Sequence, residues 1–289
     1  MAGAGQQDPE TILAWIAGGR PDLGYGRPGD RSAREWARMM RQLGVAMVAS
    51  GRAAGAAAVT SGRWLSDLVV DTAPRIPVRD LHTLRLHHPG LDTEQLAEAL
   101  VTSASRATSS VGVAGGVMAG VQWSVPVTLL ALPAQLAVEV AAVAAIEIKL
   151  VAELHETYGV GVRGVPTQRG AAYALSWANR RGVNPLEPAT MTAALGVVAR
   201  RRVQRRLMAR AGRNLGTLAP LMAGAVYGAY SNRRQTLLLA DSLRGDLRRR
   251  PLVTGLTGNA VSKLLEPGVR RLAGLPAAGR LKRRRPPSP

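Results

Sequence analysis

The sequence of 289 residues contains no cysteine and no phenylalanine, and only 3% of its residues are aromatic. The lack of cysteine excludes disulfide bonds and thiolate metal sites, which suits the reducing interior of a cell. So few aromatic rings disfavour a protein that binds single-stranded nucleic acid by stacking its bases. Lysine is scarce as well, because it occurs only at Lys149, Lys263 and Lys282. This preference for arginine is typical of a GC-rich bacterial genome.

The sequence motifs of several common enzyme classes are also missing. There is no GxxxxGK[ST] loop, no GxGxxG after a strand and no GxSxG turn. A P-loop NTPase, a Rossmann enzyme and an ordinary serine hydrolase are therefore unsupported. We expect a protein that is not an enzyme, and the sequence indicates no cofactor, no metal site and no small-molecule substrate.

Acidic residues are scarce in the second half of the chain. Residues 1–144 carry equal numbers of acidic and basic side chains, so the whole net charge of +19 lies in 145–289. Such a charge attracts phosphate groups, on anionic lipid or on nucleic acid. In a helix predicted to begin near Pro185 or Pro188, the candidate residues for binding an anionic surface are Arg200, Arg201, Arg202, Arg205, Arg206, Arg210 and Arg213. Alternatively, these arginines form only a solvated helix face.

The longest uncharged stretch lies between Arg106 and Glu139, and it must be buried in protein or in lipid. Its prolines at 126 and 133 predict a turn between two helical arms, with the second arm from about 133 to 158. We therefore predict an all-α domain built on a central apolar helical hairpin. Glycines at four-residue spacing let helices approach closely, and those expected at such contacts are Gly112, Gly116, Gly120, Gly224 and Gly228.

The second arm changes character along its length. Residues 134–146 are apolar on nearly every side, which predicts an enclosed segment. Further on, Glu147, Lys149, Glu153 and Glu156 predict a side that faces water. Glu139 has to be paired, neutralised or placed at a wet boundary, and the boundary is the favoured interpretation.

The remaining segments predict further helices around this hairpin. Residues 1–31 predict a short helix, capped by Asp8, and an irregular linker. The helical domain spans 32–250, and a basic, disordered tail spans 251–289. A helix from 32 towards 68 contains Ala and Gly in its middle, which either pack tightly or break it. Asp92 and Gln95 have the spacing of a capping box for a helix to about 107, after which the hairpin begins.

Two further helices complete the domain. One is predicted from a cap at Thr167 to Arg181, where Gly182 ends it. The other is predicted from about Pro220 to Arg249, apolar first and polar later.

The four histidines do not form a known metal motif. His155 and Glu156 lack the second histidine of a metalloprotease helix, because Gly159 occupies that position. A surface helix is therefore the expected setting for His155. A solvated loop or short turn is expected for the other three, His82, His87 and His88.

The order of these elements resembles the EcsC family of bacterial proteins over roughly 75–250. The similarity lies in a Gly-rich apolar segment that leads into a helix ending in Tyr158-Gly159. It also lies in a Pro-x-x-x-Gly-Ala segment before an asparagine, here Pro220, Gly224, Ala225 and Asn232. The segment RDLHTLRLHHPGLDTEQLAEAL is similar to an actinobacterial branch. The resemblance implies a helical protein, linked by name to an exporter operon, with no catalytic residues to transfer.

These observations lead to two hypotheses about function. The first is a cytoplasmic, membrane-associated helical protein, held on anionic lipid at the inner face of the cell membrane by its hairpin and its arginine-rich helix. A membrane-protein partner and nucleic acid stay open as partners. The second is a soluble helical regulator or nucleic-acid-associated protein whose hairpin is simply its core. A mean hydropathy of +0.01 argues against a polytopic transporter.

Overall fold

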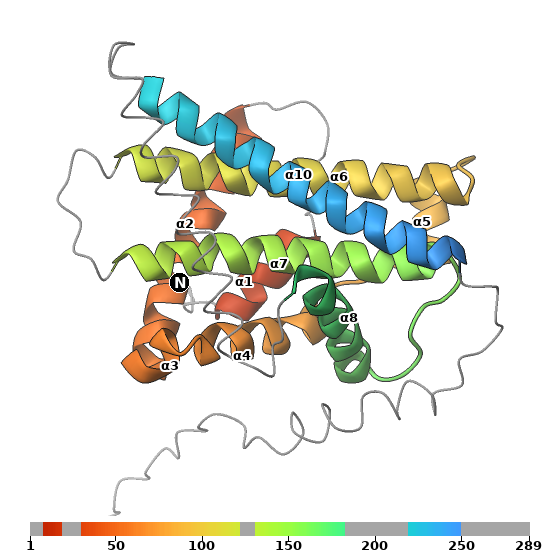
Figure 1. Cartoon of the computed structure of the whole chain (residues 1–289), viewed down its shortest axis with the longest axis horizontal. Coiled ribbons are helices and arrows are strands. Elements are labelled where there is room, and N and C mark those ends of the chain that lie inside the picture. The colour runs from red at the N-terminus through yellow and green to blue at the C-terminus, as the bar shows by residue number, and fades with distance from the viewer. Residues whose placement is uncertain (1–7, 19–29, 122–130, 183–218, 250–289) are drawn as a thin grey trace, which may run out of the picture. The chain divides into compact units, whose positions relative to one another are not determined.

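The computed structural model of the protein describes residues 8–18, 30–121, 131–182 and 219–249. Within these ranges the regular structure is helical and contains no strand, so the predicted all-α fold class is confirmed (Figure 1). The chain divides into a compact unit of residues 1–252 and a second unit of residues 253–289. The second unit lies outside the described residues, and the predicted disordered tail stays a prediction.

Helix α7, Ala131–Thr157, lies at the centre of the compact unit. The helices that contact it are α1 (Pro9–Gly18), α2 (Asp30–Ala54), α4 (Arg63–Thr72), α5 (Leu81–His87), α6 (Thr93–Val121), α8 (Pro166–Arg181) and α10 (Ala219–Arg249). In Figure 1, α7 runs between the pair α6 and α10 and the pair α1 and α4. Almost all of its side chains from Ala141 to Leu154 are buried. The protein itself therefore encloses this part of the predicted second arm.

Helix α6 is one continuous helix to Val121, where the sequence predicted a separate helix ending near 107. It packs against α7, and the connection between them, 122–130, lies outside the described residues. Its most extensive contact is with α10, which crosses it in Figure 1. A Cβ atom added at Gly112 would lie 2.2 Å from the carbonyl oxygen of Gly228. The glycine at position 112 therefore meets α10, and the expectation of a close helix contact is met there by Gly112 and Gly228.

The long helix expected from residue 32 towards 68 is broken twice. Helix α2 ends at Ala54, α3 spans Ala56–Thr60 and α4 begins at Arg63. Gly55 and Gly62 separate these helices, and their φ angles are +86° and +77°. Other residues rarely adopt such a backbone conformation, so the two glycines allow the chain to turn here. Of the two alternatives left open by the sequence, breakage is the one observed.

Local signals at several helix ends are confirmed. The Asp8 carboxylate accepts a hydrogen bond from the Thr11 amide at 3.1 Å, which caps α1. At the start of α6, Gln95 N donates to Asp92 Oδ1 at 2.8 Å and Asp92 N donates to Gln95 Oε1 at 3.1 Å. Glycines with positive φ follow α7 and α8, namely Gly159 and Gly182. Each of these features depends on residues close in sequence, which explains why the sequence predicted them.

Three local predictions differ from the structure. The segment with three histidines, expected to be a loop or short turn, contains α5, because Asp80 caps a helix by accepting from the Thr83 amide at 2.7 Å. Helix α8 begins after Val165, so Thr167 is not its cap. Helix α1, which was set apart from the domain, buries Ile12 and Leu13 in the same hydrophobic core as α7. Helix α1 therefore belongs to the helical domain.

No described helix combines the length and the apolar character that a membrane crossing requires.

Candidate functional site: buried charges and exposed basic faces

The charged residues in the second half of α7 do not face water as predicted. Glu147 is 0% exposed, and Lys149 and Glu153 are buried as well. Only Glu156 is partly exposed. The prediction was wrong because charged partners, among them Arg79 and Arg181 from elsewhere in the chain, reach these side chains and replace water around them.

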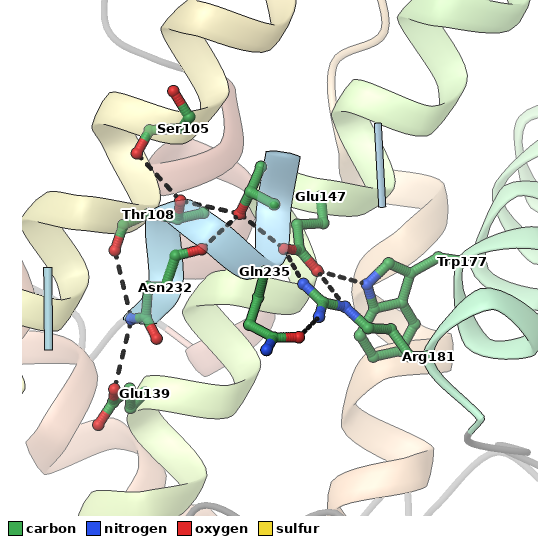
Figure 2. Close-up of polar contacts among 9 residues, drawn as sticks. Ser105, Thr108, Glu139, Glu147, Trp177, Arg181, Asn232 and Gln235 are labelled. Atoms are coloured by element: carbon green, nitrogen blue, oxygen red, sulfur yellow. Dashed lines mark hydrogen bonds and ion pairs between the residues drawn. The ribbon is translucent and has the colours of Figure 1, made fainter. Parts of the chain in front are cut away.

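Glu147 is held by donors from two neighbouring helices. Arg181 of α8 forms a two-pronged ion pair with it, with Nε 2.9 Å from Oε2 and Nη2 on Oε1. Trp177 Nε1 donates to Oε2 at 2.9 Å, and Thr236 Oγ1 of α10 donates to Oε1 at 2.8 Å. Figure 2 shows Glu147 with Arg181 and Trp177 grouped around its carboxylate. Such a paired and hydrogen-bonded geometry is what a buried charge needs.

The network continues from Thr236 to α6. Thr236 and Thr108 are joined by a hydrogen bond between their hydroxyl oxygens of 2.9 Å. When Thr236 donates its single proton to the Glu147 carboxylate, it can only accept from Thr108. Asn232 Nδ2 donates to the Thr108 carbonyl oxygen and to Glu139 Oε1, each at 3.3 Å (Figure 2). The network therefore connects α6, α7, α8 and α10.

Glu139 does not mark a wet boundary, which was the favoured interpretation. It is only 5% exposed and accepts the hydrogen bond from Asn232. Of the three alternatives weighed from the sequence, a polar partner within the protein is the one observed. Asn232 lies on α10, far along the chain from Glu139, so no local pattern could have identified this pairing.

A second buried cluster surrounds Glu153. Arg79 donates to it through Nε and Nη2, both at 2.8 Å, and Lys149 Nζ lies 2.6 Å from Oε1. Lys149 Nζ also donates to the Pro77 carbonyl oxygen at 2.6 Å. Burial by itself would raise the pKa of Glu153, but the hydrogen bonds from Arg79 and the charge of Lys149 outweigh burial and lower that pKa. This cluster ties the chain before α5 to α7.

The two clusters serve to hold helices together. Both oxygens of Glu147 accept hydrogen bonds from protein donors, and so do both oxygens of Glu153. A carboxylate saturated in this way is not positioned to act as a base or a metal ligand. Among the described residues there is no group of three or more His, Asp or Glu side chains that could hold a metal ion.

His155 is buried, so the expectation of a surface position was wrong. Its Nδ1 lies 2.6 Å from the Val151 carbonyl oxygen, and its ring is 5.5 Å from the ring of Tyr173 between centroids. The neighbouring Glu156 accepts a hydrogen bond from the Tyr173 hydroxyl at 3.4 Å. His82 and His87 are exposed on α5.

The surface of α2 is basic along one face. Arg38, Arg41 and Arg52 are exposed there, and Val45 and Val48 lie exposed between them. These positions recur at helical spacing and so share one side of the helix. The sequence contains no acidic residue between Glu35 and Asp67, so no acidic side chain of α2 itself interrupts this face. We call these five residues the α2 basic face.

Helix α10 has an outward face with a different composition. Between Val226 and Leu238 its exposed side chains lie within one side of the helix, and they are Val226, Tyr227, Tyr230, Arg233, Arg234 and Leu238. We call these six residues the α10 outward face. Sequence reasoning described this helix only as apolar first and polar later. The signal that could have found the face is the recurrence of Val226, Tyr230 and Arg233 at helical spacing.

The predicted site residues are only partly described. The seven arginines from Arg200 to Arg213 lie outside the described residues. Gly112 and Gly228 are brought together at the crossing of α6 and α10. The other glycines predicted for helix packing lie in these two helices, at positions whose surroundings are outside the described side chains: Gly116, Gly120 and Gly224.

Comparisons with known proteins found no match to a family model, a curated protein or a solved structure. The resemblance to the EcsC family therefore stays a prediction.

Proposed function

We propose that this chain is a non-enzymatic helical protein that docks from inside the cell on the anionic surface of the membrane. The observation that carries the proposal is the α2 basic face, which offers three exposed arginines and two exposed valines. Near an anionic surface each basic residue contributes about 1 kcal/mol before screening by salt. Valine side chains between the arginines add a small apolar contact with the lipid interface. The resemblance to the EcsC family is part of this proposal.

The proposed docking is peripheral. The buried part of α7 already has protein around it, so it has no apolar side to offer to lipid. The arginine-rich segment 200–213 is proposed as a second contact with the same surface, because its seven arginines lie on a predicted helix. A protein held in this way is released by salt, since exposed charges are screened over about 8 Å at physiological ionic strength.

A second candidate function is a helical regulator or nucleic-acid-associated protein. The enclosure of α7 within the protein favours it, because that candidate treats the apolar arm as core. Arginines on the α2 basic face would also bind the phosphates of duplex DNA, without sequence preference and with strong dependence on salt. The two functions therefore predict different outcomes when anionic vesicles and duplex DNA compete for the protein.

Vesicle sedimentation tests the proposal. We expect the protein to bind anionic vesicles at low salt and to bind neutral vesicles weakly. The triple variant Arg38→Gln, Arg41→Gln, Arg52→Gln should bind anionic vesicles at low salt about a hundredfold more weakly, given about 1 kcal/mol for each basic residue. A matched control removes the same charge elsewhere, with Arg63→Gln, Arg85→Gln and Arg106→Gln, and should lose less affinity. Equal losses in the two variants would mean that only net charge matters and that the α2 basic face is not the docking surface.

The arginine segment is tested in the same assay. Changing Arg201, Arg202, Arg205 and Arg206 to Gln should weaken binding to anionic vesicles by orders of magnitude, because four charges of about 1 kcal/mol each are removed. Unchanged binding would show that this segment is only a solvated helix face. If duplex DNA displaces the wild-type protein from vesicles at matched phosphate, the second candidate function becomes the better one.

A further inference from the structure

The α10 outward face combines aromatic, apolar and basic side chains in a fixed order. Tyr230 is 61% exposed and Val226 is 63% exposed, and the two lie one helical turn apart on the same face. Arg233 and Arg234 follow one turn later, and Leu238 is exposed beyond them. From Val226 to Leu238 the face is about 18 Å long at 1.5 Å per residue. Asp241 is the first acidic residue on this side and ends the face.

The opposite side of α10 is held rigidly against α6. Gly228 lies at the closest approach of the two helices, and Ser109 Oγ donates to the Ala229 carbonyl oxygen at 3.3 Å. Further along, the bonds of Asn232 and Thr236 to Thr108 hold the same side of α10. The outward face therefore belongs to a firmly packed helix, and its side chains are presented together without a change of fold.

The composition of this face fits the interface of a lipid bilayer better than it fits nucleic acid. A tyrosine side chain has an apolar ring and a polar hydroxyl, and such side chains favour the boundary between hydrocarbon and headgroups. Arginines one turn away can extend to lipid phosphates while their apolar stems lie along the interface. Val226 and Leu238 would have no favourable contact with a phosphodiester backbone. The charge of Arg233 and Arg234 selects an anionic lipid.

We propose that the α10 outward face inserts shallowly into the interface of an anionic membrane, with its tyrosine end in the acyl boundary and its arginines at the phosphates. This inference rests on the proposed function. Insertion of the α10 outward face would give the bound protein a defined orientation on the membrane. In this proposal the apolar contact with the lipid comes from Val226, Tyr230 and Leu238 of the α10 outward face.

Removal of the apolar side chains separates this inference from the proposed function. The double variant Val226→Ser, Tyr230→Ser keeps every charge, so its binding to the soluble polyanion heparin should equal that of the wild type. Its binding to anionic vesicles should be roughly tenfold weaker, because apolar area is no longer buried in the interface. Both substituted side chains are exposed, so thermal melting should be unchanged and serves as the folding control.

A fluorescent label gives an independent measurement. Because the sequence contains no cysteine, Tyr230→Cys introduces a single thiol for an environment-sensitive dye. On anionic vesicles the dye should shift to the blue, and lipids brominated near the headgroup should quench it. The matched control is Leu86→Cys on α5, where Leu86 is 67% exposed, and its dye should stay in water.

The outcomes separate the two proposals. If the wild type binds anionic vesicles while the double variant binds equally well and the dye at position 230 shows no shift, the α10 outward face is not the membrane interface and the proposed function stands. If the wild type does not bind anionic vesicles at low salt, the proposed function fails and this inference fails with it.

Discussion

Helices α7 and α10 have similar patterns of residues and opposite surroundings. Each begins with an apolar segment and becomes charged towards its C-terminal end. Helix α7 buries its charged residues between several neighbours, whereas α10 exposes a broad side that carries two arginines and two tyrosines. A charged residue on a helix therefore faces water only when no oppositely charged partner lies within reach. Glu147 has such a partner in Arg181, although 34 positions separate them in the chain.

The largest expected effect comes from breaking the central ion pair. Arg181→Met leaves the Glu147 carboxylate buried without its cation, and removal of one partner of a buried pair costs about 3–5 kcal/mol. Chemical denaturation measures this loss as a lower free energy of unfolding. The matched control is Arg180→Met, because Arg180 pairs with Asp246, a half-exposed residue, at 2.8 Å. If both variants lose the same small free energy of unfolding, the buried pair of Arg181 and Glu147 contributes no more to stability than the pair of Arg180 and Asp246.

The next effect concerns the crossing that holds α10. Gly112→Ala places a Cβ atom 2.2 Å from the Gly228 carbonyl oxygen, a backbone atom that cannot move aside without shifting the helix. We expect a loss of about 1–3 kcal/mol in the free energy of unfolding, and a larger loss for Gly112→Leu. The control is Gly44→Ala on α2, where a Cβ atom meets nothing within 4 Å. That variant should be neutral or stabilised by about 0.5–1 kcal/mol, because alanine favours a helix. An unchanged melting temperature for Gly112→Ala would show that the two helices are not in close contact.

The smallest effect comes from the exposed charges near the end of α10. Glu94 is bound by Arg248 Nε at 2.9 Å and by Arg244 Nη2 at 2.9 Å. The hydrogen bonds from Arg248 and then Arg244 lower the pKa of Glu94 from 4.5 to about 2, against the opposing effect of burial. Since the folded pKa is the lower one, the stabilisation is present above pH 4.5 and is lost as the pH falls towards 2.

Thermal melting as a function of pH measures this contribution. At pH 7, Glu94→Gln should lower the melting temperature by a few degrees at most, because exposed ion pairs contribute about 0–1 kcal/mol. The difference from the wild type should vanish near pH 2. Glu98→Gln is the control with a single arginine partner, and its effect should be smaller. If the difference in melting temperature between Glu94→Gln and the wild type stays constant from pH 7 to pH 2, the effect does not come from ionisation of Glu94.

Local features of the chain were predictable from sequence because their physical causes lie within a few residues. The cap at Asp8, the paired bonds of Asp92 and Gln95, and the turn at Gly182 each involve side chains and amides at most four positions apart. The long uncharged run likewise required enclosure, since so many apolar side chains cannot face water. From such evidence the all-α class and most of the helices follow.

Which helix faces meet and which charges are buried depends on contacts between residues that are far apart in the chain. Glu153 and Arg79 are 74 positions apart, and Thr108 and Thr236 are 128 apart, so no periodicity along one helix could reveal either contact. The spacing of Val226, Tyr230 and Arg233 places them on one face of α10, but the sequence does not show that this face is exposed, because the apolar residues of that helix are divided between the α6 contact and the surface. A single sequence specifies which residues share a helix face. Only the packing of the other helices determines whether that face meets protein or water, because burial depends on what reaches the side chain from elsewhere in the chain.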